Sequence, residues 1–132
     1  MKRRDFLIAG TAAALLPSVA SAALEYTPGL VQKRLAAGET IFLDFKAVWC
    51  STCAAQERVI NALRAENPDY DAKITFVTVD WDTYRRAPVT VDRNIPRRST
   101  LVVLKGEEEL GRLVAGTSRK QIKTLMDIAL NA

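Results

Sequence analysis

Four short runs of apolar and β-branched residues along the chain predict the strands of a sheet. The first, residues 40–45, is almost continuously apolar, which is typical of a strand covered on both faces. The second, residues 74–79, is rich in β-branched residues, and the third spans residues 100–104. A turn at Lys105-Gly106-Glu107 leads into the fourth, residues 110–115, so the last two runs predict a β-hairpin.

Three other segments have the periodicity of helices. Residues 28–37 form a short one that ends at Gly38, and residues 54–65 form a second that Asn67-Pro68-Asp69 ends. The third starts at Ser118, where the order Ser-Arg-Lys-Gln resembles a capping box. The apolar face of the second helix is predicted to contain Ala55, Val59, Ile60 and Leu63, and that of the third Ile122, Leu125, Met126, Ala129 and Leu130.

Residues 81–98 have no clear period. Asp82 suits the cap of a short helix, but Pro88 interrupts that helix and Pro96 follows soon after. The order of elements is otherwise an alternation of helices and strands. It predicts an α/β fold, a central mixed four-stranded sheet with helices on both faces, in one domain of residues 23–132.

Residues 1–22 have the composition of an export signal. A basic start is followed by an apolar stretch from Phe6 to Leu16, and Ala20-Ser21-Ala22 is a small-x-small cleavage pattern. Arg3-Arg4-Asp5-Phe6-Leu7 resembles a twin-arginine signal, although Lys2 stands where Ser or Thr is usual. An ordinary secretory signal and an uncleaved membrane anchor are the alternatives. Cleavage after about Ala22 would leave a periplasmic protein, in a compartment where disulfides persist.

Charge and composition exclude several classes of function. The net charge is +4, but residues 23–132 hold 16 basic and 14 acidic side chains, too few in excess to bind polyanions, so we expect no nucleic-acid partner. The chain has no histidine, which excludes Cys-His and Ser-His catalysis. Two cysteines supply only half of a structural zinc site, so we expect no metal.

The two cysteines lie in Trp49-Cys50-Ser51-Thr52-Cys53, between a predicted buried strand and a predicted helix. A thiolate at the N-terminus of a helix is stabilised by free N–H groups and by the helix dipole. Cys53, one turn further on, is expected to be more buried and to act as the resolving thiol. Trp49 is expected to form an apolar lip over the sulfur and part of a docking surface.

The segment from Ile41 to Cys53 resembles the active-site segment of the thioredoxin-like family, exported WCxxC thiol–disulfide oxidoreductases included. The resemblance implies that Cys50 is the nucleophile and Cys53 the resolving cysteine. It also implies that Asp44 is a buried acid beneath the disulfide that assists proton transfer; the alternative is a carboxylate at the strand end that faces water. No cofactor beyond a redox-active Cys50–Cys53 disulfide is implied.

Two departures from the family pattern concern redox tuning and substrate binding. Ser51-Thr52 is neither the Gly-Pro of reducing thioredoxins nor the Pro-His of strongly oxidising relatives. Ser99 falls where the family has a cis-proline, with Arg98 and Thr100 beside it, whereas Pro96 requires a three-residue shift. We expect Arg98, Ser99 and Thr100 to bind substrate, with backbone that pairs with an extended peptide.

These observations favour an exported enzyme that reduces protein disulfides by dithiol exchange. The resemblance and the compartment imply a membrane-bound thiol relay as electron donor, and a monomer suffices. One alternative is an oxidase or isomerase of exported thiols, and another is a non-catalytic binding module with a structural disulfide. The latter is disfavoured, because structural bridges usually close longer loops.

Overall fold

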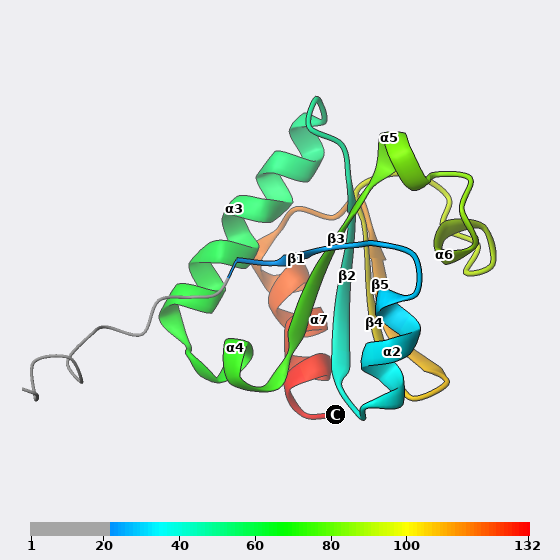
Figure 1. The fold of residues 1–132 in the computed structure, drawn as a ribbon. Coiled ribbons are helices and arrows are strands. Elements are labelled where there is room, and N and C mark those ends of the chain that lie inside the picture. The colour runs from blue at the N-terminus through cyan, green and yellow to red at the C-terminus, as the bar shows by residue number, and fades with distance from the viewer. Residues whose placement is uncertain (1–21) are drawn as a thin grey trace, which may run out of the picture.

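The structure is a computed structural model that describes residues 22–132. The predicted export signal, except for its last residue, lies outside the described residues. Within the described part of the chain, no helix is both long and apolar enough to cross a membrane. Figure 1 shows a central twisted sheet with helices on both faces, as the sequence predicts.

Five strands form the sheet, in the order β1-β3-β2-β4-β5. The central strand β2 (Thr40–Lys46) pairs in parallel with β3 (Thr75–Asp80) and antiparallel with β4 (Thr100–Lys105). The hairpin partner of β4 is β5 (Glu108–Val114). The fifth strand, β1 (Leu24–Glu25), adds a short parallel edge to β3 and has no counterpart among the four predicted runs.

Strand β2 is rich in apolar residues because both of its faces are covered. Phe42 belongs to one core cluster with α3 (Ser51–Glu66), α4 (Asp69–Lys73) and α7 (Arg119–Leu130). The odd-numbered residues of the strand lie in a second cluster, on the face of α2 (Leu30–Ala36). Since side chains alternate along a strand, Asp44 shares the face of Phe42 and is directed toward α3.

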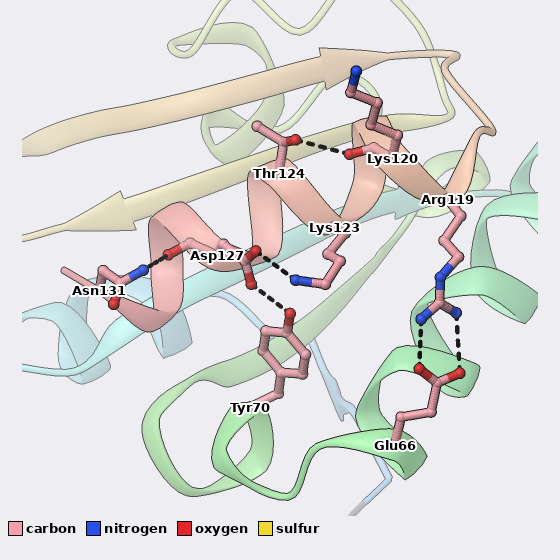
Figure 2. Close-up of polar contacts among 8 residues, drawn as sticks. All are labelled: Glu66, Tyr70, Arg119, Lys120, Lys123, Thr124, Asp127 and Asn131. Atoms are coloured by element: carbon pink, nitrogen blue, oxygen red, sulfur yellow. Dashed lines mark hydrogen bonds and ion pairs between the residues drawn. The ribbon is translucent and has the colours of Figure 1, made fainter.

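Helix α7 is bonded to α3 and α4, which lie on the same face of the sheet. Ser118 caps it by accepting a hydrogen bond from the Gln121 N–H, as the capping pattern predicts. Figure 2 shows two further ties: Tyr70 of α4 donates to the carboxylate of Asp127, and Arg119 pairs with the carboxylate of Glu66 at the end of α3. The predicted apolar stripe is buried at Ile122, Leu125, Met126 and Ala129, and Leu130 packs against it.

The helices of the irregular region are short and differ from the prediction. Asp80, not Asp82, caps α5 (Trp81–Tyr84), by accepting a hydrogen bond from the Thr83 N–H at 3.0 Å. Pro88 does not interrupt a helix but opens α6 (Pro88–Val91), since proline is favoured in the first turn. These two helices cover the sheet on the face of α2 (Figure 1).

Candidate active site

The two cysteines form a disulfide at the N-terminus of α3. Cys50 is the N-cap residue, Cys53 lies in the first turn, and their Cα atoms are 5.2 Å apart. The Cys53 N–H donates to the Cys50 sulfur at 3.1 Å. The sulfur of Cys50 thus occupies the position of a helix-capping acceptor, where developing negative charge is stabilised.

Both sulfur-bearing residues are largely shielded from solvent. Cys50 is 4% exposed and Cys53 is 1% exposed, so the first is the one within reach of a partner. Ala47 and Trp81 pack around the pair. This difference in exposure has the direction that the sequence predicts.

Ser99 is the residue that faces the disulfide. Its hydroxyl oxygen lies 3.2 Å from the Cys50 sulfur and 3.1 Å from the Cys53 sulfur. Pro96 is exposed, and the side chain that faces the sulfurs is that of Ser99. The structure therefore places Ser99, not Pro96, where the family has its cis-proline. No peptide bond among residues 22–132 is cis, and Ser99 instead has a left-handed backbone with φ of 66°.

The backbone N–H and carbonyl of Ser99 are both hydrogen-bonded inside the protein. Its N–H donates to the Phe45 carbonyl at 2.7 Å, and its carbonyl accepts from the Ala115 N–H at 2.8 Å. Gln56 of α3, itself fully buried, donates to the same carbonyl at 3.0 Å. The backbone of Ser99 itself is therefore already paired, and pairing of an extended substrate with the backbone of the loop stays a prediction.

Thr100 also differs from its predicted role. It is fully buried, and its hydroxyl donates to the Arg97 carbonyl at 2.6 Å, so it offers a partner protein no surface. Its main effect is to fix the turn that precedes β4. Contact of a partner with Trp49 and Arg98, which were also expected to bind substrate, stays a prediction.

Next to Cys50, the exposed Trp49 and the half-buried Arg98 form an aromatic platform. The Trp49 side chain is 59% exposed, and its indole N–H donates to Asp82 at 2.9 Å. The Arg98 guanidinium lies over the indole ring, 4.5 Å from the ring centroid. These two contacts hold the ring at its N–H edge and over one face, and Val48 beside it is almost fully exposed.

Asp44 is a buried acid, which excludes the solvent-facing alternative. It is 8% exposed, and its Oδ1 has no hydrogen-bond partner in the structure. Burial raises the pKa of Asp44 to about 7; the nearby Lys46 opposes this shift and Glu57 adds to it. Lys46 and Glu57 pair with each other at 2.9 Å, so their charges largely offset. A carboxyl group with this pKa exchanges protons at neutral pH.

Three parts of the site are not among the predicted site residues. Gln56 could have been found from spacing, because it lies four residues before Ile60 and seven before Leu63, on the same helix face. The bond from Trp49 to Asp82 joins residues 33 positions apart, and no local pattern signals it. The Lys46–Glu57 pair likewise depends on how α3 packs on β2.

Comparison with known proteins agrees with this geometry. The sequence model of the thioredoxin family matches residues 23–128. Thioredoxin H5 of Oryza sativa subsp. japonica is 32% identical over 79 residues, which are 60% of this chain and 54% of that protein. The thiol:disulfide interchange protein TxlA of Synechococcus elongatus is 31% identical over 97 residues, 74% of this chain and 47% of that protein.

A solved structure has the same fold along nearly its whole length. Trxlp from Edwardsiella tarda superimposes with a TM-score of 0.66 at 27% identity, covering 78% of this chain and 98% of its own. The chain spans about half the length of the curated relatives it matches. Because the thioredoxin family model matches residues 23–128, which are most of the chain, the chain belongs to the thioredoxin family.

Proposed function

We propose that the protein is an exported thiol–disulfide oxidoreductase that reduces disulfides in other proteins by dithiol exchange. The observation that carries the proposal is the Cys50–Cys53 disulfide at the N-terminus of α3, with Cys50 beside an exposed aromatic platform. The relative TxlA is a thiol:disulfide interchange protein, which agrees with the proposed activity. Cofactors beyond the disulfide are not needed for this chemistry.

The proposed reaction uses both thiols in turn. The Cys50 thiolate attacks one sulfur of the partner's disulfide, forms a mixed disulfide and releases the other partner sulfur as a thiolate. Cys53 then loses its proton, attacks the Cys50 sulfur and releases the second partner thiolate. Asp44 is the proposed acceptor of the Cys53 proton, because its pKa of about 7 leaves it able to take up a proton at neutral pH.

Insulin reduction tests this activity. With dithiothreitol as the electron donor, we expect the wild-type protein to accelerate precipitation of the insulin B chain and Cys50→Ala to abolish the acceleration. Lys33→Ala, an exposed change on α2, is the matched control and is expected to behave as wild type. No acceleration by the wild-type protein would instead indicate a binding module with a structural disulfide, and equal acceleration by Cys50→Ala would show that Cys50 is not the nucleophile.

Two features of the site bear on the redox direction. The absence of histidine between the cysteines favours a reductant, whereas the Ser99 hydroxyl beside the sulfurs favours the oxidising alternative. The reduction potential decides between them. We expect a value well below the ER poise of about −180 to −210 mV in glutathione buffers; a value near about −120 mV, that of a strong oxidant, would reverse the direction.

Export to the periplasm is proposed from residues 1–22. With the full-length chain expressed in a bacterium, we expect a periplasmic product that begins near Ala23. The double substitution Arg3→Lys and Arg4→Lys is expected to retain the protein in the cytoplasm if the twin-arginine route is used. A product of unchanged location would favour the general secretory route.

The proposed partners are disulfide-containing exported proteins and a membrane-bound thiol relay that returns electrons. A soluble nicotinamide-dependent donor is not expected outside the cytoplasm. We propose a monomer, which sedimentation equilibrium of residues 23–132 tests directly. A concentration-dependent dimer would contradict that part of the proposal.

A further inference from the structure

The hydroxyl group of Ser99 lies between the two sulfur atoms of the disulfide. It is 3.2 Å from Cys50 and 3.1 Å from Cys53, and Ser99 is completely buried. Neither sulfur of a disulfide carries a hydrogen atom. The hydroxyl is therefore the donor in these contacts, and it points its single proton at the reacting atoms.

The backbone of Ser99 is held in place beside the disulfide by hydrogen bonds inside the protein. Its N–H is bonded to Phe45, and its carbonyl accepts from both Ala115 and Gln56. The Gln56 amide also donates to the Gly116 carbonyl at 3.0 Å, which ties the loops before β4 and after β5 to α3. The left-handed backbone of Ser99 is thus fixed by three hydrogen bonds.

We propose that Ser99 is a catalytic residue whose hydroxyl donates a hydrogen bond to the Cys50 thiolate and thereby stabilises the reduced form of the enzyme. The inference rests on the proposed function and deepens it. Hydrogen bonds to a charged acceptor are shorter and about twice as strong as those to a neutral one. The hydroxyl therefore stabilises the thiolate more than it stabilises the disulfide.

The redox step balances with a donor dithiol. A thiolate of the donor attacks the Cys50 sulfur, and Cys53 leaves as a thiolate that takes up a proton. The second donor thiol loses its proton to solvent and displaces Cys50, so the donor becomes a disulfide. Cys50 remains as a thiolate bonded to Ser99, and Cys53 as a thiol. Ser99 also lies within reach of Cys53 while that sulfur leaves.

The test is the thiol–disulfide equilibrium of Ser99→Ala with glutathione at a fixed pH. Loss of a hydrogen bond to a charged group predicts a shift of about tenfold or more toward the disulfide. The pH midpoint of Cys50 alkylation by iodoacetamide in the reduced protein is expected to rise in parallel. The ionisable side chains on neighbouring elements, Asp44, Asp82 and Arg98, are unchanged in this variant.

Two further variants separate the hydroxyl from the backbone. Ser99→Gly also lacks the hydroxyl but relieves the left-handed conformation, so it folds even where alanine is poorly tolerated. We expect it to shift the equilibrium as Ser99→Ala does. Thr90→Val removes another buried hydroxyl, one that donates to the Tyr84 carbonyl, and is expected to leave the equilibrium unchanged.

Equilibrium constants within twofold of wild type for both Ser99 variants would overturn the inference. So would a shift in Ser99→Ala that Ser99→Gly lacks, because backbone strain would then be its cause. Both results leave the proposed function standing, because that function fails if the wild-type protein does not accelerate insulin reduction or if Cys50→Ala accelerates it equally.

Discussion

Asp44 is a carboxylic acid that the fold holds partly protonated at neutral pH. Burial raises its pKa from 3.8 to about 7, and one of its oxygens has no hydrogen-bond partner in the structure. The folded protein therefore binds this proton more tightly than the unfolded chain does. The stability that this bound proton contributes is fully present below about pH 4, and it is lost as the pH rises through about 7.

Replacement of Asp44 by Asn removes the cost of burying a charged carboxylate at high pH. In urea unfolding of the oxidised protein, we expect Asp44→Asn to be close to wild type at pH 4 and more stable at pH 8. The difference approaches an upper limit on the order of 4 kcal/mol. Asp92→Asn, an exposed change, is the control and is expected to show no such trend. Equal stabilities of Asp44→Asn and wild type at pH 8 would mean that the acid is not destabilised by burial.

At the level of elements, α3 does more than present the cysteines. Its buried Gln56 donates to two carbonyl groups, one at Ser99 and one at Gly116, in loops that are far apart in the sequence. A helix that carries a polar side chain into the core in this way fixes the loops opposite the disulfide. The helix and the facing loops are therefore expected to unfold as one unit.

Substitution of Gln56 by Met keeps the side-chain length and removes both donors. The Gly116 carbonyl then loses its bond to the helix, so we expect a loss of about 1–3 kcal/mol in the free energy of unfolding. Arg58→Ala, an exposed change on the same helix, is expected to alter it by less than about 0.5 kcal/mol. A Gln56→Met protein as stable as wild type would show that the amide is dispensable.

The long elements were predictable because each has its own local signal. Strand β2 is apolar since helices cover both faces, and α7 has both a cap and a stripe. By contrast, α4 has only five residues and α5 and α6 have four each, too few to show a helical period. Strand β1 has two residues, and its pairing with β3 depends on the assembled sheet.

The site also has parts that a local pattern predicts and parts that depend on the assembled fold. The spacing of Cys50 and Cys53 is local, so the sequence predicts their disulfide and its place at a helix start. The burial of Thr100 and the internal bonds of Ser99 arise from strands and loops that meet only in the folded chain. Of the residues expected to bind substrate, Ser99 and Thr100 are consequently buried, whereas Trp49 is exposed and Arg98 partly exposed.

At the level of the whole molecule, one end of the sheet presents an apolar and aromatic face next to Cys50. Val48 is 91% exposed, and Trp49 is held between Asp82 and Arg98. Exposed and fixed aromatic side chains are typical anchors of protein interfaces. This face is where we expect a partner protein to dock before its disulfide reaches Cys50.

Trp49→Ala is expected to lower kcat/KM for insulin by about tenfold or more, because an interface anchor is lost. The rate with a small aromatic disulfide such as Ellman's reagent is expected to fall much less, since that substrate needs no docking face. Val91→Ala, an exposed apolar change on α6, serves as the control. Equal losses with both substrates would mean that Trp49 acts on the sulfur chemistry and not on docking.

The central claim is that Cys50 attacks the partner and Cys53 resolves the mixed disulfide. Trapping tests it most directly: Cys53→Ala and Cys50→Ala are each mixed with a disulfide-containing peptide, and the adducts are identified by mass spectrometry. We predict that Cys53→Ala accumulates a stable mixed disulfide at Cys50, whereas Cys50→Ala, with its one buried thiol, forms almost none. Faster adduct formation at Cys53 than at Cys50 would contradict the account.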